Sequence, residues 1–213
     1  MPARRLRPLL LALPAFALIA SGCDTVLDND GGNVVDVVSF LVRVDDGITS
    51  GDGLTTTFAS DDLQDATARN LIEEILDESA VTTDGVVLLY AEDDLFLGTA
   101  SGDVTRWAAL PYTEAFESID VDGIPYVDLT LTYTYSFDAG AAGTADDGNL
   151  YFDIVSSAAN VDINTFLRDR LETDRFRLRL VAIPRGLFDG SGLGLSDLQN
   201  YETVRRTFDI AAE

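Results

Sequence analysis

Residues 126–137 read YVDLTLTYTYSF, in which apolar and polar side chains alternate at every position. Successive side chains of a β-strand point to opposite faces of its sheet, so this stretch has one apolar face and one hydroxyl-rich face. The apolar face comprises Val127, Leu129, Leu131, Tyr133, Tyr135 and Phe137. The pattern predicts a strand that is buried on one side and open on the other.

Other segments repeat this two-residue period. Leu150, Phe152 and Ile154 alternate and predict the next antiparallel strand, and residues 175–183 bury Phe176, Leu178, Leu180 and Ala182. Residues 34–44 predict a first strand that ends at a turn, and residues 86–90 and 95–99 predict a hairpin around residues 92–94. Strands with one polar face predict a mainly β fold, an antiparallel β-sandwich rather than a parallel sheet.

Two stretches have the helical period instead. Within residues 61–77, apolar side chains recur three and four positions apart, at Ala68, Leu71, Ile72, Ile75 and Leu76. This spacing predicts one amphipathic helix over about residues 60–78, with Ser60 as its N-cap. Residues 195–208 predict a short C-terminal helix with Leu198, Tyr201 and Phe208 facing inward.

The N-terminal residues have the composition of an export signal. Arg4, Arg5 and Arg7 precede the apolar run 9–20, which is too short to span a bilayer, and small residues lead to Cys23. Residues 20–23 (ASGC) resemble a bacterial lipobox, whose cysteine is acylated, although Ala20 stands where that motif prefers leucine. An ordinary cleaved signal is the alternative. We expect a signal peptide at 1–22, an acidic tether at 23–33 and one globular domain at 34–213, held in the cell envelope by lipid on Cys23, in either the inner or the outer membrane.

The charge balance excludes some partners. The chain has 37 acidic residues against 14 basic ones, and its formal net charge is −23. All the basic residues are arginines. Nucleic-acid binding needs clustered basic side chains, so this composition excludes it. The acidity indicates adaptation to high salt, with calcium binding as the alternative.

The residue types that are missing exclude some chemistry. The sequence contains no histidine and only one cysteine. A histidine-based triad is excluded, and if Cys23 is acylated so are a cysteine nucleophile, the usual zinc site and a disulfide. We therefore expect a noncatalytic protein without a cofactor, folded around a single apolar core, with chemistry at serine, aspartate or glutamate as the remaining alternative.

Three groups of residues are candidates for binding. Arg175, Arg177 and Arg179 share one face of a strand and could hold an anion, although cross-strand pairing with acids explains them more simply. Asp120, Asp122, Asp146 and Asp147 resemble fragments of calcium loops, although turn chemistry accounts for them equally. Four aromatic residues could stack on sugar rings or support a partner interface, with core packing as the alternative: Trp107, Tyr112, Phe116 and Tyr126.

Several strand and turn patterns carry a resemblance to a known family. GVVLLYAEDD (85–94), RWAALPYT (106–113), FRLRLVAIP (176–184) and SDLQNYETVRRTF (196–208) resemble a family of uncharacterised bacterial surface lipoproteins, some of which have collagen-like repeats. This chain has no such repeat. The resemblance implies a compact domain displayed on a lipid anchor and no known activity. The expected role is structural contact with an envelope protein or glycan, and the alternative is a calcium- or carbohydrate-binding module.

Overall fold

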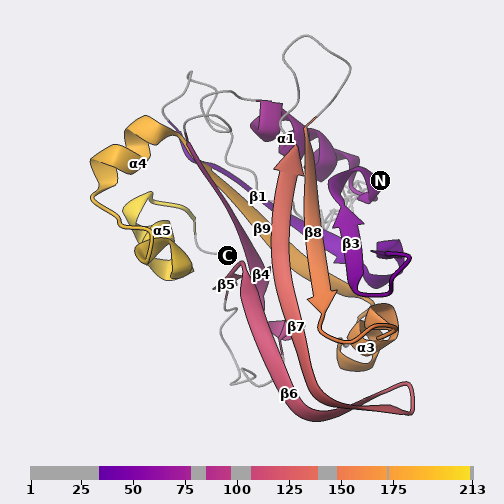
Figure 1. Ribbon diagram of the computed structural model, residues 1–213. Helices are drawn as coiled ribbons and strands as arrows, with labels where there is room; N and C mark the ends of the chain where they lie inside the picture. The colour runs from indigo at the N-terminus through magenta and orange to yellow at the C-terminus, as the bar shows by residue number, and fades with distance from the viewer. Residues whose placement is uncertain (1–33, 78–84, 97–106, 139–147, 172, 212–213) are drawn as a thin grey trace, which may run out of the picture.

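The computed structural model describes residues 34–77, 85–96, 107–138, 148–171 and 173–211. Within them, two antiparallel sheets pack as a sandwich (Figure 1). Sheet A has the order β1 (Asp36–Arg43), β9 (Arg175–Ile183), β4 (Val86–Glu92) and β5 (Trp107–Ala109). Sheet B has the order β2 (Ile48–Thr49), β3 (Thr55–Ala59), β8 (Asn149–Ser156), β7 (Ile124–Asp138) and β6 (Tyr112–Val121). The predicted antiparallel β-sandwich is confirmed.

Strand β7 lies inside sheet B between β8 and β6, and one of its faces is buried, as its alternation predicts. Leu129, Leu131 and Tyr133 are fully buried, and Tyr135 and Phe137 pack against the same core. Its predicted partner is confirmed, because β8 pairs antiparallel with β7 from Leu131↔Ser156 to Asp138↔Asn149. Val127 departs from the prediction and is exposed.

Aromatic and branched side chains from both sheets fill the space between them. Phe58 of β3 lies 5.3 Å from Phe176 of β9, ring centre to ring centre, and Phe152 of β8 lies 5.5 Å from Phe176. The Phe58–Phe176 pair is edge-to-face and the Phe152–Phe176 pair is tilted, and such aromatic contacts add to the stability that burial of apolar area provides. This core therefore ties sheet A to sheet B.

Helix α1 (Ala66–Asp77) packs against β1 and β8, and its buried residues are the five that the sequence predicts. The predicted start and cap are wrong. Residues Ser60–Asp62 form a 3-10 turn, and the helix begins only after Asp65, whose carboxylate accepts hydrogen bonds from the amides of Thr67 and Ala68. The Ser60 hydroxyl instead donates to Asn149 at 2.6 Å. Serine and aspartate are both common N-caps, so the sequence pattern does not distinguish Ser60 from Asp65, five residues later.

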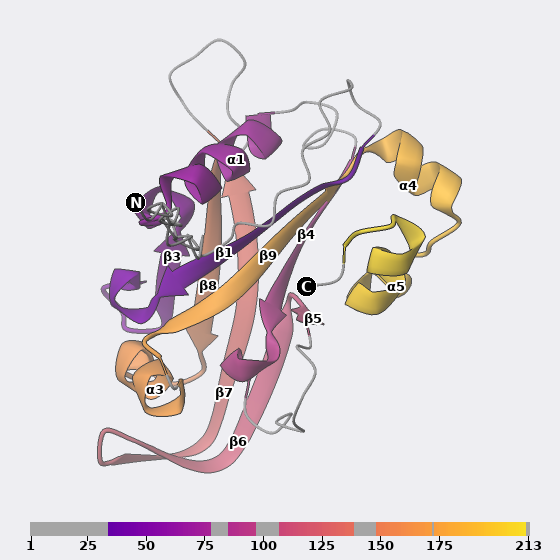
Figure 2. The same ribbon diagram turned by 180° about the vertical axis from the view of Figure 1, so that it is seen from behind.

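Three short helices complete the described fold: α3 (Ile163–Arg170), α4 (Arg185–Ser191) and α5 (Tyr201–Thr207). Helix α5, with the 3-10 turn Asp197–Gln199, realises the predicted C-terminal helix, with Leu198 and Tyr201 buried and Phe208 half-buried. Helices α4 and α5 lie on the outer side of sheet A, away from sheet B (Figure 2). Sheet A is therefore covered on both faces at this end.

The predicted hairpin at 86–99 is wrong. Strand β4 extends to Glu92, but Asp93–Leu95 form a 3-10 turn, and residues 97–99 lie outside the described residues. The neighbours of β4 are β9 and β5, which are distant in sequence. The acidic run 92–94 has the same composition as a hairpin turn, so the sequence does not separate the two.

Candidate interaction site

The three candidate arginines lie along β9 but in different surroundings. Arg175 is exposed, Arg177 is half-buried with its guanidinium 3.9 Å from the Glu92 carboxylate, and Arg179 is 3% exposed. Burial therefore rises along the strand toward the end that α5 covers. The structure does not present the three as one open stripe.

Arg179 lies in an aromatic enclosure. Its guanidinium is 4.4 Å from the centre of the Trp107 ring and 5.1 Å from that of Tyr201, and it donates to the Ser39 hydroxyl at 2.8 Å and to the Tyr201 hydroxyl. A guanidinium is weakly hydrated and stacks on aromatic faces, which suits it to a buried position. These contacts join α5 to sheet A, so Arg179 serves packing of the C-terminal helices.

The metal candidates are only partly described. Asp146 and Asp147 lie outside the described residues. The Asp120 carboxylate accepts a hydrogen bond from the Gly123 amide at 2.8 Å, and Asp122 and Gly123 have φ of 52° and 75°, which are the angles of a tight hairpin turn. Within the described residues, no group of three or more acidic, cysteine or histidine side chains could hold a metal ion. Calcium binding stays a prediction.

The aromatic candidates all contact the cores. Trp107 packs in the second core beneath α5, and the Tyr112 ring lies 4.5 Å from Phe96. Phe116 meets Phe166 of α3 edge-to-face at 5.9 Å, and the Tyr126 hydroxyl donates to the Asn160 carbonyl at 3.1 Å. The structure places these rings in packing positions, as the simpler sequence interpretation expects.

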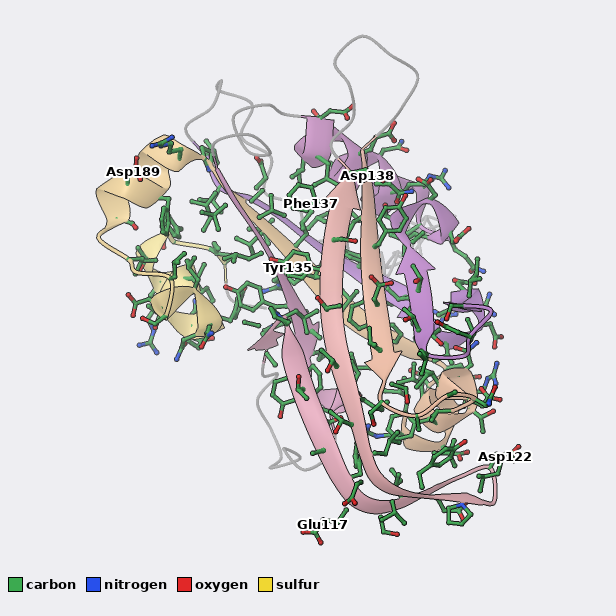
Figure 3. The ribbon with its side chains drawn as sticks, viewed as in Figure 1. Glu117, Asp122, Tyr135, Phe137, Asp138 and Asp189 are labelled. Carbon is green, nitrogen blue, oxygen red and sulfur yellow. The ribbon has the colours of Figure 1, made fainter. Side chains whose placement is uncertain are left out.

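Strands β6 and β7 form a hairpin that extends beyond their neighbours. Strand β8 pairs with β7 only from Leu131 onward, so the part nearer the turn is a two-stranded ribbon. We call this part, residues 116–129, the arm. Figure 3 shows Glu117 and Asp122 of the arm at one end of the molecule and Asp138 at the other.

The arm begins where the alternation of both strands reverses. On β6 the inward side chains change from Phe116 to Ile119, and on β7 from Leu129 to Tyr126, each three positions apart rather than two. Asp128 lies at this point with φ of 54°, which is uncommon for a non-glycine residue. The backbone therefore turns at Asp128 and exposes Val127, which explains why the strict alternation predicts this residue wrongly.

An isolated two-stranded hairpin has little stability in water, so the arm needs support. Helix α3 supplies it through Phe166, and the helix is capped by Asp162, whose carboxylate accepts from the Thr165 amide at 2.9 Å. That bond from the Thr165 amide lowers the pKa of Asp162. The inner side chains Ile119, Val121 and Tyr126 pack against the main core.

A buried polar cluster fixes the base of the arm. Glu114 of β6 points inward and accepts from the Tyr133 hydroxyl at 2.9 Å, while the Arg170 guanidinium of α3 lies 3.5 Å from the same oxygen. Burial, and then the charge of Glu114, raises the pKa of Tyr133 above its usual value. Arg170 also lies over the Phe166 ring at 4.8 Å. The cluster thus ties β6, β7 and α3 together.

The outer surface of the arm is apolar and acidic. Val127 is 71% exposed and Ile124 is 52% exposed, which are high values for branched apolar side chains. The whole hairpin, residues 112–138, contains six acidic residues and no basic residue. Val127 and Ile124 are three positions apart on β7, so they lie on opposite faces of the arm, and each face exposes one large apolar side chain. The arm is therefore the candidate interaction site.

Sequence reasoning missed the arm because it read β7 as one uninterrupted strand. The available signals were Asp122 and Gly123, which favour a two-residue hairpin turn, and the apolar residues at 119, 121 and 124 on either side. Helix α3 was also missed, although Asp162 precedes Ile163, Phe166 and Leu167 at helical spacing.

Comparisons with known proteins give no relative. No family model matches the chain, and no curated protein or solved structure matches it. Among the described residues, none of the helices has the length and apolar character needed to cross a membrane.

Proposed function

We propose that this chain is an exported envelope lipoprotein, anchored through acylated Cys23, whose β-sandwich has a noncatalytic role and contacts a protein partner through the arm. Support for the anchor comes from the arginines, apolar run and small residues that precede Cys23. Acylation of a lipobox cysteine adds several chains, and two or more chains hold a protein stably on a bilayer.

The position of the arm is the observation that favours a contact role. Strand β1 starts at Asp36, which pairs with Ala182 at the end of β9, next to α4. In Figures 1 and 2, α4 lies at one end of the molecule and the turn of the arm lies at the other. A chain tethered ahead of Asp36 therefore carries the arm on the side far from its point of attachment.

Anchoring is tested by metabolic labelling with an alkyne fatty acid in the native host. We expect the full chain to be labelled and to partition into detergent, and Cys23→Ser to lose both properties. Labelling of Cys23→Ser equal to that of the unchanged chain would overturn the anchor.

The contact role is tested by site-specific photocrosslinking in cells. A photoreactive residue at position 127 is compared with one at Ile48, which is 68% exposed on the opposite edge of sheet B and so matches Val127 in exposure. We expect a discrete crosslinked protein from position 127 and none of that size from position 48. Identical crosslinks from both positions, or none from either, would contradict the proposal.

Calcium binding is the alternative to a contact role. Thermal unfolding with calcium, against sodium chloride at equal ionic strength, distinguishes a bound ion from charge screening, because a ligand of the native state raises Tm by mass action. A saturable rise with calcium alone would favour a ligand-binding module. Equal shifts with both salts would leave the contact role as the better explanation.

A further inference from the structure

The edges of the two sheets differ in how they are covered. Helix α1 packs against edge strand β1, β2 has only two residues, and β5 has three residues and forms a bridge through Ala108 to Asn200. Strand β6 has ten residues and pairs only with β7 among the described strands. A long open edge is a template for pairing with another chain, and proteins usually shorten or cover it.

The backbone of β6 presents hydrogen-bonding groups outward at a definable position. Ala115 is opposite Thr130, whose carbonyl accepts from the Ser157 amide and whose amide donates to the Ser157 hydroxyl, both at 2.9 Å. Thr130 therefore directs both groups away from β6. In an antiparallel ladder, opposite residues either exchange both bonds or point both groups apart, so the N–H and C=O of Ala115 face the open edge.

The charge along this edge selects the partner. Strand β6 exposes Glu117 and Asp120 and contains no basic residue, so a second copy of β6 placed alongside would bring like charges together. A strand with lysine or arginine would meet complementary charge at Glu117 and Asp120 of β6. Its inward apolar side chains would lie beside the half-buried Phe116 and Ile119 of β6. Exposed Ala115 leaves room for an approaching backbone.

We propose that an extended segment of a partner protein, with alternating basic and apolar side chains, adds to the open edge of β6 as a further strand of sheet B. Main-chain hydrogen bonds would provide affinity and the acidic side chains would provide selectivity. This inference rests on the proposed contact role of the arm and specifies its geometry.

The test measures binding of a ten-residue lysine–valine alternating peptide to the full chain by fluorescence anisotropy at fixed salt. Its matched control has the same charge but carries N-methyl groups on alternate amides, which removes backbone donors. On the protein side, Ala115→Pro removes the outward N–H without removing a bond to β7, and Ala115→Ser keeps that N–H. Proline is tolerated at edge strands in this orientation.

We expect Ala115→Pro and the N-methylated peptide each to weaken binding at least tenfold, and Ala115→Ser to bind like the unchanged chain. A glutamate–valine peptide should not bind. Equal affinity for both lysine peptides would show charge attraction alone and overturn the inference, whether or not Ala115→Pro folds. Crosslinking from position 127 that is unchanged by Ala115→Pro would keep the contact role and reject strand addition.

Discussion

Strands β9 and β7 are both long and alternate in sequence, yet their outer faces have different surroundings. The outer residues of β9 become buried toward its C-terminal end, where α5 covers Arg179, Val181 and Ile183. The outer residues of β7 remain partly open as a row of hydroxyl side chains, Thr130, Thr132 and Thr134. The difference shows that a period of two defines the faces of a strand but not what covers them.

Loss of the contacts between α5 and β9 should have the largest effect on the free energy of unfolding. Tyr201 is buried, and its ring lies 5.1 Å from Tyr90 and 5.9 Å from Trp107. We expect Tyr201→Ala to lower the free energy of unfolding by about 3–5 kcal/mol, as for other large aromatic residues. Denaturant unfolding followed by emission of Trp107, the only tryptophan, measures it. Tyr201→Phe removes only the hydroxyl and should lower the free energy of unfolding by about 1 kcal/mol. If Tyr201→Ala lowers the free energy of unfolding by less than this amount, sheet A does not need the cover that α5 provides.

A second substitution tests the core that both sheets share. A Cβ on Gly47 would lie 2.7 Å from the Phe58 ring and 2.8 Å from the Asn164 side chain. Overpacking of this kind costs about 1–3 kcal/mol, so Gly47→Ala should lower the midpoint of denaturant unfolding. Gly51→Ala is the matched control, because nothing lies within 4 Å of its Cβ position, and it should be neutral or slightly stabilising. Equal midpoints for the two variants would contradict the close contact.

The support of the arm in sheet B is tested at the start of α3. Asp162→Ala removes the N-cap bond to Thr165 and should cost about 1 kcal/mol, while Asp162→Asn should retain most of it.

The pKa of Asp162 is lowered in the folded protein, so its charge stabilises the fold above the unfolded pKa of about 3.9, and this contribution is lost as pH falls through the folded value. Urea unfolding at pH 7 and pH 3 measures the change. If the original chain and Asp162→Asn differ by the same free energy of unfolding at both pH values, the charge of Asp162 contributes nothing to stability.

The smallest effect is expected on the open face of sheet B. Thr134 is half-buried opposite Asp153, on the face that no described helix covers. Thr134→Ala should change the free energy of unfolding by about 0.5 kcal/mol or less, as surface substitutions usually do. The same denaturant titration measures the change. If Thr134→Ala lowered the free energy of unfolding as much as Tyr201→Ala does, the outer face of β7 would be covered, like the outer face of β9.

Local pattern predicted several elements well and a few poorly. The bounds of β9 and the five buried residues of α1 follow from periodicity, because burial of an apolar face needs those positions on one side. The predicted start of α1 is too early. Ser60 and Asp65 are both good caps, and Ser60 does not cap the helix because its hydroxyl donates to Asn149 instead. Strand β3 and helices α3 and α4 are short, and their periodicity is correspondingly weak.

The candidate site depended more on tertiary structure. Nothing local to RFRLRLVAI (175–183) distinguishes Arg175, which is exposed, from Arg179, which is enclosed by Trp107 and Tyr201. Likewise the reversal at Asp128 needs support from α3, which is distant in sequence, before the arm can extend beyond β8.

The sequence by itself determined the antiparallel sandwich, the acidic net charge and a composition without histidine, because periodicity and composition are properties of single segments. Only the tertiary structure decided which sheet face is covered, which arginine is buried and which long edge strand has no second neighbour among the described strands. These depend on contacts between segments far apart in the chain, such as Arg179 with Tyr201 and Glu114 with Arg170. Short-range sequence patterns do not predict such contacts, because the burial of a side chain depends on which distant segment packs against it.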